Sequence, residues 1–286
     1  MKPENLRTKI FLDSGDPNET RQIMGILGFL DGQTTNPTLI SKNPIARERF
    51  EKGEKFAKEE IYAFYHEVVD EISRLIPSGS VSIEVYADAD ISSSEMIKEA
   101  SEMYEWIPNA HIKLPITREG LKAAEQSIKE NMRVNMTLCF SQEQASAVYA
   151  ATKGASKGNV FVSPFIGRLD DIGENGMGLI KNILEMYKNG DKHVEVLTAS
   201  VRNIEHLLCA LHLGSDIVTA PYKLLKEWSE IGMPMPNDYI CKSNGLKEIA
   251  YQNIDLKKNW PDFNISHQLT DKGIERFSND WNALIK

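Results

Sequence analysis

Residues 111–140, HIKLPITREGLKAAEQSIKENMRVNMTLCF, combine a strand, a helix and a second strand in one short stretch. The runs HIKLP (111–115) and VNMTLCF (134–140) have the length and composition of strands. Between them, Thr117 stands directly before REGLKAAEQSI, a segment with apolar residues at helical spacing, and is a candidate N-cap. A strand, a helix and a strand in this order are typical of a parallel sheet.

The same alternation continues on both sides of this unit. Helix starts are indicated by Asp16-Pro17 and by Ser141 with Gln144, which together predict a capping box. Eight strand-helix units form a closed barrel more readily than an open sheet, which usually has five or six strands. We therefore predict an α/β fold, a single (β/α)8 TIM barrel that spans residues 1–286 as one catalytic domain. The other six strand runs are KIFLD (9–13), GQTTN (32–36), VSIEVYA (81–87), NVFVSPF (159–165), HVEVLTAS (193–200) and DIVTAP (216–221).

Two segments are longer than a minimal unit requires. Residues 43–80 are charged and amphipathic, which predicts an extended helical segment after the second strand. Residues 230–286 contain two prolines and a final helix, and we expect them to be a C-terminal helical extension. In that helix Phe277 and Trp281 stand four residues apart, a spacing that suits packing on the barrel or on a neighbouring subunit.

The formal net charge is -8, and lysines and arginines are not gathered in a run. This balance argues against non-specific binding to nucleic acid or membranes, so any anion site must be local. Neither the N-terminus, MKPENLRTKIFLD, nor any other stretch has an apolar run of about 18 residues, and we expect a cytoplasmic location. Cys139, Cys209 and Cys241 are odd in number and far apart, which favours reduced core thiols.

Polar residues occur at or near the ends of seven predicted strands. In a barrel of this kind the active site lies at the C-terminal ends of the strands, so these residues are candidates for the site. They are Asp13, Thr34, Asn36, Glu84, Lys113, Asn135, Thr137, Ser163, Arg168, Ser200 and Arg202.

Lys113 lies between Ile112 and Leu114 in a short apolar strand. An ammonium group is costly to desolvate there, which favours the neutral amine, and a neutral amine is a nucleophile toward ketones. The alternative is a structural lysine paired with Asp13 or Glu84. Position alone leaves both open.

The two carboxylates have alternatives of their own. Together with an amine they can divide the acid and base roles of a reaction. Asp13 could instead cap a helix within the turn DSGDP. Glu84 interrupts a β-branched run, so an inward glutamate there needs a partner or a function.

Arg168 and Arg202 follow the sixth and seventh strands, where barrels often bind phosphate, and Ser200 could add a contact. The alternative is a pair of surface ion pairs, such as Arg168 with Asp170 or Asp171. The histidines have no metal-ligand spacing beyond a weak pair, His206 and His212, and the glycines of GENGMG are not spaced as in a dinucleotide-binding loop. We therefore expect neither a metal nor another cofactor.

Taken together, these segments resemble the transaldolase family of class I aldolases, through most of the chain from the first strand to the eighth. The motifs that carry the resemblance are FLDSGDPNE, DGQTTNPTLISK, SIEVYA, HIKLPITREGLKA, VNMTLCFSQEQA, SPFIGRLDD and TASVRN.

The resemblance implies that a dihydroxyacetone unit is transferred between phosphorylated sugars of the pentose phosphate pathway. Lys113 would form an iminium ion with the C2 carbonyl of a ketose phosphate, such as fructose 6-phosphate or sedoheptulose 7-phosphate. Asp13 would take the proton of the C4 hydroxyl, and Glu84 with Thr137 would hold a water. The acceptor would be erythrose 4-phosphate or glyceraldehyde 3-phosphate. Asn36, Asn135 and Ser163, with Thr34 nearby, would hydrogen-bond the three-carbon unit, and Arg168, Ser200 and Arg202 would bind the phosphate.

A related branch that resembles this chain cleaves fructose 6-phosphate and releases free dihydroxyacetone. That branch typically has glutamine in place of Glu84 and tyrosine in place of Phe165, so both residues here indicate the transferase. A barrel that only binds sugar phosphates would not need Asp13, Glu84 and Lys113 together. The resemblance further implies a homo-oligomer with sugar phosphates as its substrates, and the charge balance predicts no nucleic-acid or membrane partner.

Overall fold

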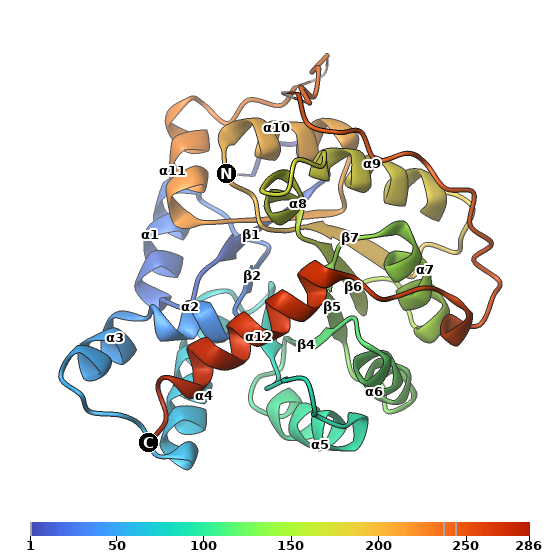
Figure 1. The fold of residues 1–286 in the computed structure, drawn as a ribbon. Helices are drawn as coiled ribbons and strands as arrows, with labels where there is room; N and C mark the ends of the chain where they lie inside the picture. Colours follow the sequence, from blue (N-terminus) through green and yellow to red (C-terminus); the bar gives the residue numbers. More distant parts are fainter. Residues whose placement is uncertain (1, 237, 244) are drawn as a thin grey trace.

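The computed structural model describes residues 2–236, 238–243 and 245–286, and within these residues eight parallel strands close into a barrel (Figure 1). The strands follow one another in chain order around the barrel, and the last pairs with the first to close it. The predicted (β/α)8 barrel is confirmed.

Each predicted run coincides with one observed strand, although β3 and β4 begin one residue before their runs, at Ser80 and Ala110. The observed strands end a few residues before several of the predicted runs do, because the chain there turns into the loops that carry polar residues. The strands are β1 (Lys9–Asp13), β2 (Gly32–Thr34), β3 (Ser80–Glu84), β4 (Ala110–Pro115), β5 (Val134–Cys139), β6 (Val160–Pro164), β7 (Val194–Thr198) and β8 (Ile217–Ala220).

The helices begin where the sequence places their caps. Asp16 accepts a hydrogen bond from the backbone N–H of Asn18 (2.9 Å), and Thr117 accepts one from that of Gly120 (3.0 Å). The helices are α1 (Pro17–Leu27), α2 (Pro37–Ser41), α3 (Pro44–Glu51), α4 (Lys58–Leu75), α5 (Ser93–Tyr104), α6 (Arg118–Lys129), α7 (Gln142–Ala151), α8 (Ile166–Asp170), α9 (Gly176–Tyr187), α10 (Ile204–Leu213), α11 (Tyr222–Glu230) and α12 (Gln268–Asn282).

One cap differs from the prediction. Ser141 caps α7 by accepting from the N–H of Gln144 (3.1 Å), but the Gln144 side chain does not complete a capping box. Its amide oxygen instead accepts from the N–H of Phe140 (2.7 Å), and its amide nitrogen donates to Thr270 (2.8 Å). The hydrogen bond to Thr270 connects α7 to the first turn of α12.

An aromatic layer fills the barrel below the strand ends. The Phe161 ring meets the Phe11 ring edge-on at 6.0 Å between centroids, and the His111 ring stacks on it at 4.1 Å. Side chains alternate along a strand, so residues two positions later face the same side. Asp13, Lys113 and Ser163 therefore stand one layer above these rings, toward the C-terminal mouth.

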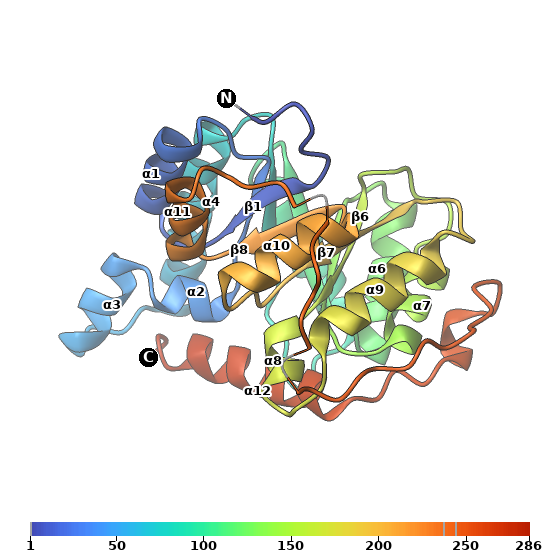
Figure 2. The same ribbon diagram turned by 90° about the horizontal axis from the view of Figure 1, so that it is seen from above.

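The chain after α11 ends by crossing that mouth. Within the described part of 230–286 it forms a short 3-10 helix (Trp260–Asp262) and α12, and the rest is irregular. Helix α12 lies over the barrel opening beside α2 (Figures 1 and 2). Phe277 and Trp281 are buried, as expected for packing on the barrel, and Trp281 contacts the rings of Tyr62 and Tyr65 on α4. The helical segment predicted over residues 43–80 consists of α3 and α4.

The interpretation of all three cysteines as reduced thiols is wrong. Cys209 on α10 and Cys241 in the irregular segment form a disulfide, with 5.3 Å between their Cα atoms, and Cys139 is free and buried. Residues 32 positions apart come together because the segment after α11 passes back over α10. No described helix is both long and apolar enough to span a membrane.

Candidate active site

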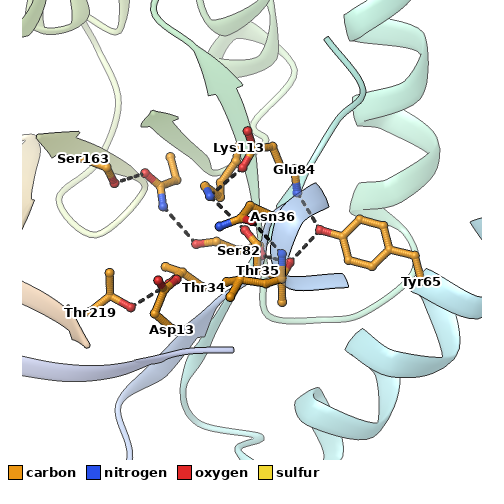
Figure 3. Close-up of polar contacts among 12 residues, drawn as sticks. Asp13, Thr34, Thr35, Asn36, Tyr65, Ser82, Glu84, Lys113, Ser163 and Thr219 are labelled. Atoms are coloured by element: carbon orange, nitrogen blue, oxygen red, sulfur yellow. Dashed lines mark hydrogen bonds and ion pairs between the residues drawn. The ribbon is translucent and has the colours of Figure 1, made fainter. Parts of the chain in front are cut away.

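The polar residues predicted at the strand ends surround one cavity of about 310 Å³ at the C-terminal mouth. Figure 3 shows Lys113, Asp13, Asn36 and Ser163 converging from different strands and loops. Glu84, Asn135 and Thr137 are buried in the wall behind it. The predicted residues that line the cavity itself are Asp13, Thr34, Asn36, Lys113, Ser163, Phe165, Arg168, Ser200 and Arg202.

Lys113 is the most buried cation that lines the cavity, with a side chain 3% exposed. Its Nζ lies 2.6 Å from Oε2 of Glu84 and donates to the backbone oxygen of Thr35 at 2.8 Å. Glu84 is its register partner on the adjacent strand β3. The pairing with Glu84 that we kept as an alternative is therefore present. This ion pair leaves Lys113 accessible to a ligand, because Lys113 also lines the cavity.

The surroundings of Glu84 suit proton exchange. Burial raises the pKa of Glu84, and the charge of Lys113 opposes that rise. A carboxylate with a raised pKa beside an ammonium group can accept its proton and leave a neutral amine. The backbone N–H of Glu84 donates to the hydroxyl of Tyr65 (3.0 Å), which also bonds Thr35 (2.6 Å) and so fixes β3 against β2.

Thr137 lies on the strand next to Lys113. Its hydroxyl oxygen is buried and, among the described residues, has no hydrogen-bond partner. A buried hydroxyl normally has a partner, so this group retains the capacity to hydrogen-bond a water within the wall.

Asp13 is held by a threonine hydroxyl. Its Oδ1 accepts from Thr34 (2.7 Å), whose hydroxyl also contacts that of Thr219 (2.6 Å). Burial raises the pKa of Asp13, while the Thr34 hydrogen bond and the charges of Lys113 and Lys42 lower it. The alternative in which Asp13 caps a helix is wrong, because Asp16 is the residue that caps α1.

Two asparagines frame the site. The amide nitrogen of Asn135 donates to Ser82 (3.1 Å), and its oxygen accepts from Ser163 (2.6 Å). Asn36 caps α2 through its side-chain oxygen, which accepts from the N–H of Leu39 (2.9 Å). That bond leaves the amide NH₂ of Asn36 available at the cavity wall. The polar wall can therefore both donate hydrogen bonds to a ligand and accept them from it.

The two predicted arginines differ in their partners. Arg202 donates to Asp171 at 2.8 Å, so it has the surface ion pair that we assigned to Arg168 as an alternative. Asp170 pairs with His206 instead. Among the described residues, no carboxylate lies within ion-pair distance of Arg168, whose guanidinium lies 5.3 Å from the ring centroids of Phe165 and Phe277. Burial and the neighbouring Arg276 lower the pKa of Arg168 to about 10. Such a cation is suited to bind an anion.

The cavity also contains residues that the sequence did not single out for chemistry. Thr219 lies on β8, Lys42 lies at the end of α2, and Arg276 and Phe277 lie on α12. Phe277 was predicted only to pack. No local signal marks Lys42 or Arg276, because both reach the cavity only through the way α2 and α12 lie across the mouth.

Comparisons with known proteins agree with this geometry. The sequence profile of the Transaldolase/Fructose-6-phosphate aldolase family matches residues 10–286. A protein of Brucella ovis named "Probable transaldolase" is 38% identical over 273 residues, which cover 96% of each chain. One of the same name from Dehalococcoides mccartyi is 35% identical over 278 residues, covering 97% of this chain and 100% of its own.

A solved structure is similar in fold alone. It is that of a Mesorhizobium loti protein described as a dehydratase, with a TM-score of 0.51 at 11% identity. The match covers 77% of this chain and 57% of that one.

Proposed function

Because the chain belongs to the transaldolase/fructose-6-phosphate aldolase family, we propose that it is a transaldolase that works through a Schiff base on Lys113. It would transfer a dihydroxyacetone unit from fructose 6-phosphate or sedoheptulose 7-phosphate to erythrose 4-phosphate or glyceraldehyde 3-phosphate. The observation that carries the proposal is a buried lysine, 2.6 Å from a carboxylate, at a cavity that arginines also line.

In the first half of the proposed reaction, Glu84 takes a proton from the Lys113 ammonium and the neutral amine adds to C2 of the ketose. Loss of water from the carbinolamine gives the iminium ion. Asp13 then removes the C4 hydroxyl proton, the C3–C4 bond breaks, and its electrons pass into the iminium as an enamine forms. The aldose phosphate leaves. The iminium is the electron sink of this step.

In the second half, the enamine carbon attacks the carbonyl of another aldose, and Asp13 returns its proton to the new hydroxyl. Water then hydrolyses the iminium and frees the lysine. Glu84 and the unpartnered hydroxyl of Thr137 would hold that water. Support for Asp13 as the shared acid and base comes from its raised pKa and from its place on the cavity wall.

A second candidate is the cleavage reaction, in which the enamine is protonated and dihydroxyacetone is released. Phe165 favours transfer, because it lines the cavity with a ring that has no proton to give, and Glu84 favours transfer by the resemblance. Assays of free dihydroxyacetone from fructose 6-phosphate, with and without erythrose 4-phosphate, separate the two. We expect little release without acceptor, and Phe165→Tyr should increase it.

The Schiff base itself is tested by trapping. Borohydride added with fructose 6-phosphate should leave a reduced three-carbon adduct on Lys113, detected by peptide mass spectrometry. Lys113→Ala should abolish both adduct and exchange, while the exposed Lys272→Ala should retain them. An active enzyme whose Lys113 stays unmodified would rule out this mechanism.

We also propose that the enzyme acts in the cytoplasm, in the pentose phosphate pathway, which uses this exchange. A homo-oligomer remains a prediction, which light scattering after size-exclusion chromatography would test.

A further inference from the structure

The charge around the active-site cavity is opposite to that of the chain. The chain has a formal net charge of -8, yet the described residues that line the cavity include five cations and one carboxylate, Asp13. Glu84 pairs with Lys113 and Asp171 with Arg202, which leaves Lys42, Arg168 and Arg276 in excess over Asp13. Grouping like charges costs energy unless an anion binds among them. The excess is therefore the mark of an anion site, and one of its cations belongs to the C-terminal helix.

Helix α12 packs closely against Arg168, which lies on α8. The Phe277 ring lies beside the Arg168 guanidinium. One turn earlier, a Cβ on Gly273 would stand 2.8 Å from Nη1 of Arg168 and 2.6 Å from a methyl of Leu138, so glycine allows the helix to come this near. The hydroxyl of Thr270 donates to the backbone oxygen of Leu138 (3.0 Å) and fixes the start of the helix.

Arg276 lines the cavity and forms no close ion pair with a described carboxylate. Its side chain is 58% exposed and lines the cavity, and its nearest carboxylate is Asp280, at 3.8 Å from Nε. Asp280 also accepts a hydrogen bond from Thr38 of α2. An exposed pair at 3.8 Å contributes little, so it does not account for placing a second guanidinium beside Arg168.

We propose that Arg276 is a phosphate-binding residue of the substrate site, which makes α12 an element that selects phosphorylated substrates. Arg168 would bind the phosphate from the barrel wall and Arg276 from the roof. The inference rests on the proposed function for the identity of the sugar phosphate, whereas its phosphate chemistry rests on the charges of the cavity.

The test compares Arg276→Gln and Arg276→Lys with Lys272→Gln, which removes the same charge one turn away on the exposed face of α12. Calorimetric titration with inorganic phosphate measures binding without turnover. We expect Arg276→Gln to raise the Kd about tenfold, the loss of one charge-assisted contact, with Arg276→Lys between it and the wild type and Lys272→Gln unchanged.

Kinetics give the second readout. Arg276→Gln should raise the KM for erythrose 4-phosphate about tenfold and leave the KM for unphosphorylated glyceraldehyde unchanged, with little change in kcat. A wild-type protein that does not bind millimolar phosphate, or equal Kd values for Arg276→Gln and Lys272→Gln, would overturn the inference. Phosphate binding lost in Arg276→Gln, in a protein that performs no exchange, would keep the inference and reject the proposed function.

Discussion

At the residue scale, the balance between burial and charge decides what each carboxyl group can do. Glu84 and Asp13 both lie within the barrel mouth, and burial raises the pKa of each. Glu84 touches the lysine at 2.6 Å, whereas Asp13 is held by a neutral threonine hydroxyl. The first is therefore placed to exchange the lysine's proton, and the second to exchange a substrate's proton.

Lys42 gives a way to move the pKa of Asp13 without touching its hydrogen bonds. In the proposed mechanism Asp13 must be ionised to remove the hydroxyl proton, so activity should be lost as pH falls through the pKa of Asp13. The charge of Lys42 lowers that pKa, and Lys42→Gln should therefore raise it and shift the acid limb of kcat/KM to higher pH. Because Lys42 is exposed, the shift should shrink in high salt.

The control is Lys272→Gln, which changes the net charge equally but lies outside the cavity. Profiles for both variants and the wild type, recorded at two salt concentrations, make the comparison. An acid limb at the same pH in all three proteins would mean that Asp13 does not govern it.

Most candidate residues could be predicted at this scale because each lies in a strand or shortly after one, and the strand period fixes which side chains face inward. Arg168 and Arg202 show the limit. Both were expected at the mouth, but which of them carries the ion pair with Asp171 depends on side-chain packing around Phe165 and Phe277. No spacing along the chain encodes that packing.

At the element scale, the junction between α8 and β7 holds the arginines in place. The N–H of Gly167 donates to the backbone oxygen of Ser200 (3.1 Å), and a Cβ on Gly167 would stand 2.4 Å from that oxygen and 2.5 Å from Nε of Arg202. Both neighbours would have to move, and the backbone oxygen can do so only with the loop after β7. Glycine is therefore required where the two loops meet.

Gly167→Ala should lower the free energy of unfolding by about 1–3 kcal/mol, the usual cost of overpacking. It should also raise the KM for sugar phosphates, because the loop carries Ser200 and Arg202. Urea denaturation and steady-state kinetics measure the two effects. Gly25→Ala is the matched control, since no atom lies near its added Cβ and alanine favours a helix by up to about 1 kcal/mol. A Gly167→Ala protein as stable as that control would show that the two loops can move apart to accept the methyl group at little energetic cost.

The strands and the helix caps were predicted well because local sequence defines them. The packing of one element against another was predicted poorly. The strands, and caps such as Asp16 and Thr117, follow from composition and local hydrogen bonding. The place of α12 does not, because a helix with a buried face can pack on its own barrel or on another subunit. Tertiary contacts fix it here, among them those of Gly273, Phe277 and Trp281.

At the scale of the whole molecule, closure of the barrel brings distant parts of the chain together. β8 pairs with β1, and α12 lies beside α2, which comes from near the other end of the sequence. The barrel was predictable because repeated units imply their own closure. The pairing of Cys209 with Cys241 was not, since it depends on the path of an irregular segment for which no local pattern exists.

That pairing gives a prediction for the whole chain. In denaturant without reductant, a thiol assay should find one free thiol per chain, that of Cys139, and three after reduction. The cross-link spans a sequence separation of 32, and in the chain-entropy account closing such a loop stabilises the fold by about 4 kcal/mol. Cys241→Ser should therefore unfold at lower urea than the oxidised wild type.

Reductant separates this entropic effect from a loss of packing. If the cross-link acts by restricting the unfolded chain, reduced wild type and Cys209→Ser/Cys241→Ser should have nearly the same free energy of unfolding, and reductant should leave the double variant unaffected. Three free thiols in the untreated protein would mean that the bond is absent. Equal stability of the oxidised and reduced wild type would mean that the segment is held by contacts alone, such as the hydrogen bond from Trp228 to the backbone oxygen of Pro234 (3.2 Å).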